Sequence, residues 1–234
     1  MTVHCGSGAT EVGMLAALTE TDVRPNLMVG TSVGAANAVW FVLHPSDVDS
    51  LASLWLSLRR TDVLPTRPVR GLLGLLGFRD HLVPNSGLRR LLERWLGEID
   101  LTGTEIPVHV GATDVLTGAE VLLSKGSAVD EVLASTAIPA VFPPLHLDGR
   151  YLMDGGAVNH SPVSHAVELG ATWCGCCRPA TRVADLAAAE CCRYRVAGTD
   201  VAGRPPAGGG RRTLPGPGRP PGGGVALAAA GVTR

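Results

Sequence analysis

The sequence predicts an α/β protein in which helices alternate with the strands of a mixed or mostly parallel sheet. One observation is a short apolar run bounded by turn formers, NLMVG at 26–30, which is typical of a buried parallel strand. A second is the helical spacing of apolar residues in the segment before it, EVGMLAALTET at 11–21. The third is the alternation of such strands and helices along the chain, which favours a sheet covered by helices on both faces.

In the first half of the chain, helices are predicted on both sides of the strand at 26–30. The segment VGAANAVWFVL at 33–43 is interpreted as a helix that packs back on that strand. DVDSLASLWLSLRR at 47–60 is an expected amphipathic helix. The segment 70–98 holds a glycine-interrupted apolar stretch and then a helix for which Ser86 is the predicted N-cap.

The second half predicts two strands, a short helix, a hairpin and a last helix. IPVHVGATDV at 106–115 and AEVLLS at 119–124 read as strands joined by a turn. VDEVLASTA at 129–137 is a short helix that stops before a proline. HLDGRYLMDGG at 146–156 is a hairpin with Asp-Gly at its turn, and PVSHAVELGA at 162–171 is a helix closed by Gly170.

Length, composition and charge exclude several classes of protein. The chain has 234 residues, of which 45% are hydrophobic, enough for one sizeable α/β domain. A net charge of −1 gives no indication of a nucleic-acid partner. The sequence has no uninterrupted run of 18 apolar residues, so it predicts no membrane span. The N-terminus lacks the basic and apolar regions of a signal peptide. We therefore expect a cytoplasmic protein.

The composition divides the chain near residue 172. Residues 173–234 hold 12 of the 30 glycines, 7 of the 17 prolines and five of the six cysteines, and nine arginines against three acidic residues give them a charge of +6. The remainder carries −7. We predict one folded α/β domain over 1–172. We predict a low-complexity, disordered tail over 173–234, because its glycine- and proline-rich stretch at 203–224 cannot form long helices or strands.

Three interpretations of the tail stay open at this point. It could be a disordered basic linker, or its clustered cysteines could bind a metal, although their spacing does not match paired C-x₂-C knuckles. The third is a shifted reading frame in a GC-rich gene, because Ala, Gly, Pro, Arg, Cys and Trp dominate. We favour the third.

The stretch GTSVGA at 30–35 is the first candidate for chemistry. A strand that turns sharply into a helix exposes the turn residue above the edge of the sheet, and small neighbours are needed there, which Gly30 and Gly34 supply around Ser32. The helix that starts near Val33 directs its N-terminal amides and dipole at this serine. Ser32 is therefore a candidate nucleophile, and the alternative is an N-cap serine in a tight turn.

A nucleophilic serine also needs a base, and Asp154 is the best candidate. It follows the apolar end of the strand YLM, and Gly155 and Gly156 let the chain turn tightly beside it. Partial burial of a carboxylate at such a position raises its basicity. The alternative is a plain Asp-Gly turn.

These motifs and their flanks resemble the bacterial patatin-like phospholipase family, whose members use a Ser-Asp dyad. GTSVGA, with Thr31 beside the serine, resembles the nucleophile elbow, and STAIPAVFPPLHLDGRYLMDGGAVNHSPVSHAVELGA at 135–171 resembles the second block with its Asp-Gly-Gly. The resemblance runs from about Gly6 to Thr172. It implies a three-layer α/β/α sandwich, with Ser32 as nucleophile and Asp154 as base.

The N-terminus departs from the family pattern. The family opens with a complete strand and a glycine-rich loop whose amides form the oxyanion hole, whereas this chain begins MTVHCGSGAT. Only Gly6 and Gly8 are left as loop members, and the amide of Val33 is the expected donor beside the nucleophile. The chain is therefore expected to be truncated at its N-terminus. Because losing one oxyanion donor costs on the order of a hundred- to thousandfold in rate, we expect impaired activity.

The resemblance implies hydrolysis of lipid acyl esters, as by a phospholipase A, a lysophospholipase or an esterase. The expected partner is a lipid or acyl-ester substrate, with transient contact to a membrane surface, and no cofactor, metal or nucleic acid is expected. The leucine-rich segment at 70–82 could be a lid over an acyl chain, or a buried loop under the next helix, which we favour slightly.

Two rival functions remain open. One is a Ser-His-Asp esterase, because His160 and His165 follow Asp154 in the chain; their closeness to the aspartate in sequence counts against it. The other is a catalytically inactive patatin-like remnant that at most binds acyl chains, which the altered N-terminus and the unusual tail would explain.

Overall fold

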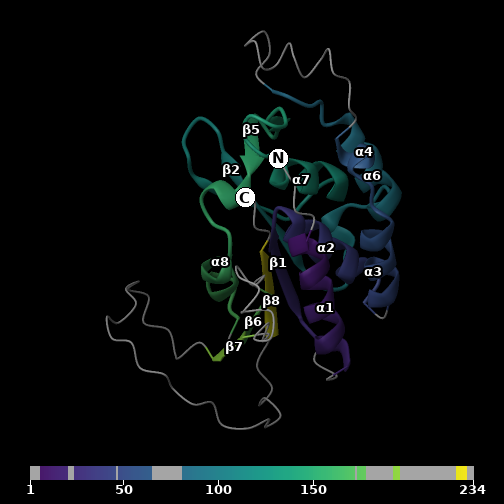
Figure 1. The fold of residues 1–234 in the computed structure, drawn as a ribbon. Coiled ribbons are helices and arrows are strands. Elements are labelled where there is room, and N and C mark those ends of the chain that lie inside the picture. Colours follow the sequence, from purple (N-terminus) through teal and green to yellow (C-terminus); the bar gives the residue numbers. More distant parts are fainter. Residues whose placement is uncertain are drawn as a thin grey trace.

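The computed structural model describes residues 6–20, 24–45, 47–64, 81–171, 173–177, 192–195 and 225–230 (Figure 1). The helices are α1 Gly6–Glu20, α2 Val33–Leu43, α3 Val48–Ser57, α4 Arg60–Val63, α6 Ser86–Leu96, α7 Ala128–Ser135 and α8 Val163–Glu168, with 3₁₀ turns η1 Leu101–Gly103 and η2 Gly155–Ala157. The strands are β1 Leu27–Thr31, β2 Val108–Asp114, β3 Glu120–Leu123, β4 Leu145–Leu147, β5 Arg150–Asp154, β6 Trp173–Cys177, β7 Cys192–Arg195 and β8 Val225–Ala230.

The described strands form one mixed sheet with β1 at its centre. β1 pairs in parallel with β2 on one side and with β8 on the other, and β8 pairs in parallel with β6. The strands β3, β4, β5 and β7 join as antiparallel partners. The mixed sheet that the alternation of elements predicts is therefore confirmed, with its parallel pairs among the central strands β2, β1, β8 and β6.

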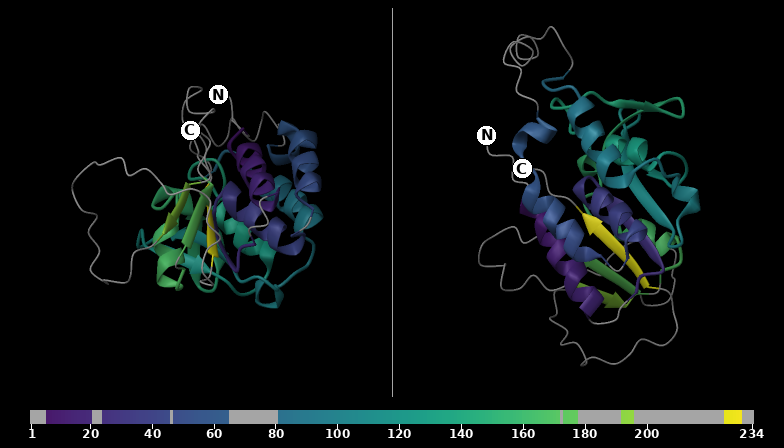
Figure 2. Two further views of the ribbon diagram at one scale, coloured as in Figure 1. Left: turned by 90° about the horizontal axis from the view of Figure 1, so that it is seen from below. Right: turned by 90° about the vertical axis from the view of Figure 1, so that its right-hand side faces the viewer.

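Helices cover both faces of this sheet, which confirms the three-layer sandwich. Successive residues of β1 point to opposite faces, because Met28 belongs to the large core under α1, α2 and α6 whereas Val29 packs with Ala166 of α8. Figures 1 and 2 show α1, α2 and α3 on one side of the sheet and α8 on the other. The side chains of Met28 and Val29 are both fully buried.

The predicted hairpin and helices are present, with small differences at their ends. Asp148 and Gly149 both have positive φ, 50° and 76°, as a two-residue type I′ turn requires. Gly170 follows α8 with φ 91°. The prediction of Ser86 as N-cap is wrong: the first helical bond runs from the Arg89 amide to the carbonyl of Asn85, so Asn85 is the cap and Ser86 the first helical residue.

Three segments of the predicted tail differ from expectation. Residues 173–177, 192–195 and 225–230 are strands of the sheet, and β8 lies directly beside β1. Short segments can join a sheet whose central strand offers an open edge, even where the sequence between them is rich in glycine and proline. The structure describes these three segments as strands where the sequence predicts disorder, and the stretch 203–224 lies outside the described residues.

None of the helices that the structure describes is both long and apolar enough to cross a membrane.

Helix α7 carries a buried carboxyl group. Glu131 is 1% exposed, and its Oε1 accepts a 2.8 Å hydrogen bond from the Lys125 amide. Burial, with a smaller contribution from the charges of Asp100 and Asp148, raises the pKa of Glu131 to about 8. The folded protein therefore holds this proton at a pH where the unfolded chain has released it.

We expect the free energy of unfolding to fall as pH rises from about 5 to 8. Over that interval the unfolded state binds fewer protons than the folded state, in which Glu131 stays protonated up to its raised pKa. Glu131→Gln keeps an oxygen for Lys125 and cannot ionise, so its free energy of unfolding should fall less across the same interval. Urea unfolding at several pH values measures both slopes. Equal slopes for parent and variant would contradict the raised pKa.

Candidate active site

Ser32 occupies a strained turn between β1 and α2. Its φ of 55° and ψ of −127° lie in a region that residues with a side chain seldom adopt, which costs on the order of 1–3 kcal/mol. A Cβ at Gly30 would lie 2.5 Å from the carbonyl oxygen of Gly34, so only glycine permits the strand and the helix to approach this closely. Gly30 thus makes the sharp turn at the serine possible.

The side chains of Ser32 and Asp154 meet directly. Ser32 Oγ donates a 2.7 Å hydrogen bond to Asp154 Oδ2. The other carboxylate oxygen, Oδ1, accepts from the Gly156 amide at 2.8 Å. Both residues are buried, with 2% and 3% of their surfaces exposed. The pair is therefore oriented by direct contacts in surroundings largely free of water.

The sheet brings these two residues together through a shared neighbour, β2. β1 pairs with β2 as far as Thr31 opposite Gly111, and β5 pairs with β2 from Ala112 opposite Asp154. Because β3 occupies the other edge of β2 over the same residues, β1 and β5 lie on one edge and run toward each other. Their C-terminal ends therefore meet where the serine and the aspartate stand.

Glycines allow this end-to-end meeting. A Cβ at Gly155 would overlap the carbonyl of Gly111 and lie 2.9 Å from the Thr31 methyl group. A Cβ at Gly111 would lie 2.7 Å from Thr31 Oγ1. At Gly156 it would lie 3.0 Å both from Asp154 Oδ1 and from a ring nitrogen of His160. The Asp-Gly-Gly motif is thus needed sterically as well as for its tight turn.

Ser135, which the sequence analysis did not identify as a site residue, connects the two halves of the site. Its hydroxyl accepts a 2.8 Å hydrogen bond from the Ser32 amide and donates at 2.6 Å to the carbonyl of Gly111. It comes from the last turn of α7 and is fully buried. Nothing in its local sequence distinguishes it from any helical serine, because both partners are distant in the chain.

Burial controls the charge of Asp154. Loss of solvent raises the pKa of this carboxyl group above its ordinary value, while the hydrogen bonds from Ser32 and Gly156 and the nearby His160 act in the opposite direction. A carboxylate with a raised pKa is a stronger base once ionised. The site thus holds a hydroxyl that donates directly to a group able to take its proton.

The two histidines that follow Asp154 in the chain, His160 and His165, do not lie between Ser32 and Asp154. His165 Nε2 contacts Glu120 at 2.5 Å and its Nδ1 lies 3.4 Å from Glu168, so it belongs to a cluster on α8 and β3. His160 lies beside Gly156, close enough for its charge to influence Asp154. No imidazole stands between Ser32 and Asp154, because the two side chains are in direct contact.

Helix α1 reaches the start of α2 next to the serine. The prediction that Gly6 and Gly8 belong to a loop is wrong, because both lie in the first turn of α1. A Cβ at Gly8 would lie 2.6 Å from Val33 Cγ1 and 2.5 Å from the ring of Trp55, so the backbone of α1 packs closely on both. Val33 is the first residue of α2, where amides lack intrahelical partners.

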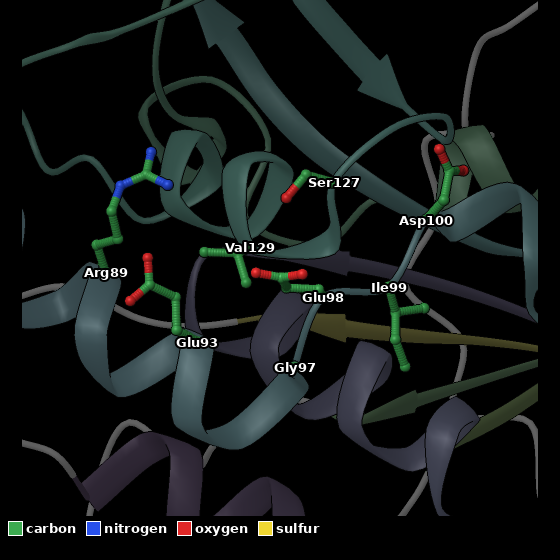
Figure 3. A pocket seen from close by; sticks show the side chains of 8 residues that line it. All are labelled: Arg89, Glu93, Gly97, Glu98, Ile99, Asp100, Ser127 and Val129. Carbon is green, nitrogen blue, oxygen red and sulfur yellow. The ribbon is translucent and has the colours of Figure 1, made fainter.

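A separate pocket opens at the other end of α7 (Figure 3). It is a cavity of about 610 Å³ between the end of α6 and the start of α7, lined by Arg89, Glu93, Gly97, Glu98, Ile99, Asp100, Ser127 and Val129. Its arginine pairs with Asp130 at 2.5 Å. Ser127 and Ser135 stand at opposite ends of α7, about 12 Å apart along the helix, so this pocket is distinct from the Ser32–Asp154 pair.

Two further sequence predictions fall outside what the structure describes. The leucine-rich segment 70–82 lies outside it except for its last two residues, and so do the side chains of the clustered cysteines. Within the described part of the chain, no group of three or more His, Cys, Asp or Glu side chains is arranged to hold a metal ion.

Comparisons with known proteins agree on one family. A family model described as patatin-like phospholipase matches residues 6–167. Patatin-like phospholipase domain-containing protein 7 of Mus musculus is 29% identical over 172 residues, which cover 70% of this chain and 12% of that protein. An NTE family protein of Mycobacterium tuberculosis is 27% identical over 171 residues, which cover 69% of this chain and 27% of that protein.

Among solved structures, VipD of Legionella pneumophila aligns with this chain with a TM-score of 0.46 and 15% sequence identity. The alignment covers 65% of this chain and 44% of the VipD chain. The chain spans about an eighth to a quarter of the length of the two relatives above.

We expect Gly155→Ala to destabilise the protein by at least about 1–3 kcal/mol, because the added methyl group overlaps the backbone of β2 at Gly111. Gly13→Ala is the matched control: it lies within α1, a Cβ there meets nothing within 4 Å, and the change should stabilise by about 0.5–1 kcal/mol. Chemical unfolding measures both. A Gly155→Ala protein as stable as the parent would mean that the strands do not meet this closely.

Proposed function

Because the chain belongs to the patatin-like phospholipase family, we propose that it hydrolyses lipid acyl esters with Ser32 as nucleophile and Asp154 as base. The observation that carries the proposal is the 2.7 Å hydrogen bond from Ser32 Oγ to Asp154 Oδ2 inside a buried site. A hydroxyl is a weak nucleophile unless a positioned base takes its proton, and this bond provides the base.

In the first step, Ser32 Oγ attacks the carbonyl carbon of the ester while its proton passes to Asp154. The tetrahedral intermediate then collapses: the bond to the leaving alcohol breaks, and the alcohol oxygen takes the proton from Asp154. The acyl group is left as an ester on Ser32. The raised pKa of Asp154 supports both transfers, since the group can accept and return a proton.

In the second step, water replaces the serine as nucleophile. Asp154 takes a proton from the water as its oxygen attacks the acyl carbon, and returns it to Ser32 Oγ when the acyl bond breaks. The products are a carboxylic acid and the regenerated serine. The bond from the Gly156 amide to Oδ1 keeps Oδ2 directed at the serine through both steps.

The developing oxyanion needs donors, and the start of α2 supports the amide of Val33 in this role. It follows the nucleophile directly and belongs to the first turn of an eleven-residue helix. The Ser32 amide is already engaged by Ser135, so it is not the donor. The first turn of α1 packs against Val33, which makes the amides at Gly6 and Gly8 further candidates.

The substrate class follows from the family. Its description and the name of the murine relative both specify a phospholipase, so we propose an acyl ester of a lipid as the substrate, met at a membrane surface. The Ser-His-Asp alternative has less support, because Ser32 contacts the carboxylate directly and His165 is engaged by Glu120.

We expect a fluorophosphonate probe to form a covalent adduct with Ser32, because the hydrogen bond to Asp154 activates this hydroxyl. Intact-mass and peptide analysis identify the labelled residue, and Ser32→Ala is the control. Labelling that persists in the variant would assign the nucleophile elsewhere. A folded parent that is never labelled would favour the catalytically inactive alternative.

We expect Asp154→Asn to lower hydrolysis of p-nitrophenyl butyrate by about a hundred- to ten-thousandfold, the usual contribution of a general base. His160→Ala and His165→Ala should each keep most of the activity, since neither imidazole accepts the serine proton. Rates are compared at equal concentrations of folded protein. A folded His160→Ala or His165→Ala protein without activity would indicate a triad instead.

A further inference from the structure

A buried polar network lies one helical turn behind the reactive serine. Asn37 stands four residues after Val33 on α2, and Glu11 stands three residues after Gly8 on α1. Such spacings place side chains on the same face of a helix, so the two contacts follow one another along the α1–α2 interface. Gly8 packs against Val33 at the end near the serine, and Glu11 bonds to Asn37 behind it.

Every hydrogen-bonding group of the Asn37 side chain is used. Its Nδ2 donates to the carbonyl of Gly8 at 3.2 Å and to Glu11 Oε2 at 2.9 Å, and its Oδ1 accepts from Trp55 Nε1 at 2.8 Å. The residue is fully buried. A single amide group therefore links α1, α2 and α3, and it holds the backbone of α1 in its first turn.

Burial disfavours the charged form of the partner carboxyl group. Glu11 is fully buried, and loss of solvent raises its pKa well above the ordinary value, against a smaller opposite effect of the bond from Asn37. Among the described residues its Oε1 has no hydrogen-bond partner. Apolar side chains would fill this interface without an unpaired polar atom, so stability alone does not account for the choice of residues.

Hydrogen bonds differ from apolar packing in that they fix direction and distance. The Gly8 contact leaves no space between α1, Val33 and the ring of Trp55, and the Asn37 bonds determine how α1 lies in that contact. Movement of α1 along or away from α2 would break them. The network thus sets the position of the first turn of α1 relative to the Val33 amide.

We propose that Asn37, held by Glu11 and Trp55, is a positioning residue for oxyanion stabilisation: it fixes the first turn of α1 against the start of α2 beside Ser32. This inference rests on the proposed hydrolase function. It assigns no direct contact with substrate to Asn37. Its effect passes through the backbone, where a misplacement of about 1 Å can cost on the order of a hundredfold in rate.

The test measures the rate constant for labelling of Ser32 by a fluorophosphonate, separately from the labelled fraction at the end point. Misfolding lowers the end point but leaves the rate of the folded fraction unchanged. A misplaced oxyanion donor lowers the rate, because the phosphoryl oxygen needs the same donors. This readout also works for a chain with slow turnover.

We expect Asn37→Ala to lower the labelling rate constant by about ten- to a hundredfold. Glu11→Ala should act in the same direction, whereas Glu11→Gln, which keeps an oxygen for Asn37 and cannot ionise, should stay within about twofold of the parent. Rescue by glutamine distinguishes the hydrogen bond from the charge.

Two tryptophans supply a matched pair of variants if Asn37→Ala does not fold. Trp55→Phe removes the donor to Asn37 and should lower the rate about threefold or more, whereas Trp40→Phe removes an indole N–H that has no partner among the described residues and should leave the rate unchanged. Parent-like rates for Asn37→Ala or Trp55→Phe would overturn the inference. A parent that is not labelled at Ser32 would instead remove the proposed function, and the inference with it.

Discussion

The site depends on one constraint of the sheet: β1 and β5 share an edge of β2 and end against each other. Their last residues pair with Gly111 and Ala112, which are adjacent in β2. Ser32 and Asp154 therefore meet although 122 residues separate them in the chain, and the hydrogen bond between them needs no long or flexible side chain. Side chains on rigid strand ends keep a reactive geometry better than side chains on loops.

Several features follow from this meeting of strand ends. Gly111 and Gly155 are glycines because the two chains approach too closely for a Cβ. Ser135 reaches the junction from α7, where it satisfies the amide of the strained serine and the carbonyl of β2 together. The strain at Ser32 is thus balanced by hydrogen bonds to Ser135 of α7 and to Asp154 of β5, and burial of the same junction raises the pKa of Asp154.

The opposite side of the serine is organised by helix packing. Gly8 brings α1 against Val33, and Asn37 ties the carbonyl of that glycine to Glu11 and Trp55. The turn at Ser32 therefore lies between a strand junction and a helix junction, each with at least one closely packed glycine and one buried polar side chain. Such an arrangement suits the acyl transfer that we propose, because it places Asp154 on one side of Ser32 and the first-turn amides of α2 on the other.

Local turn chemistry was predictable from the sequence alone. The glycines around Ser32, the Asp-Gly hairpin turn and the Asp-Gly-Gly motif each constrain only a few adjacent residues, so their patterns identified the elbow, the hairpin and the candidate pair. Only the tertiary structure decided which distant groups complete the site. Ser135, Asn37 and Glu11 look like ordinary helical residues, and Gly6 and Gly8 were assigned to a loop instead of a helix. Their roles come from contacts between residues 18 to 103 positions apart, which no local pattern encodes. The same reason applies to β8, which pairs with the central strand although that strand lies about 200 residues earlier in the chain.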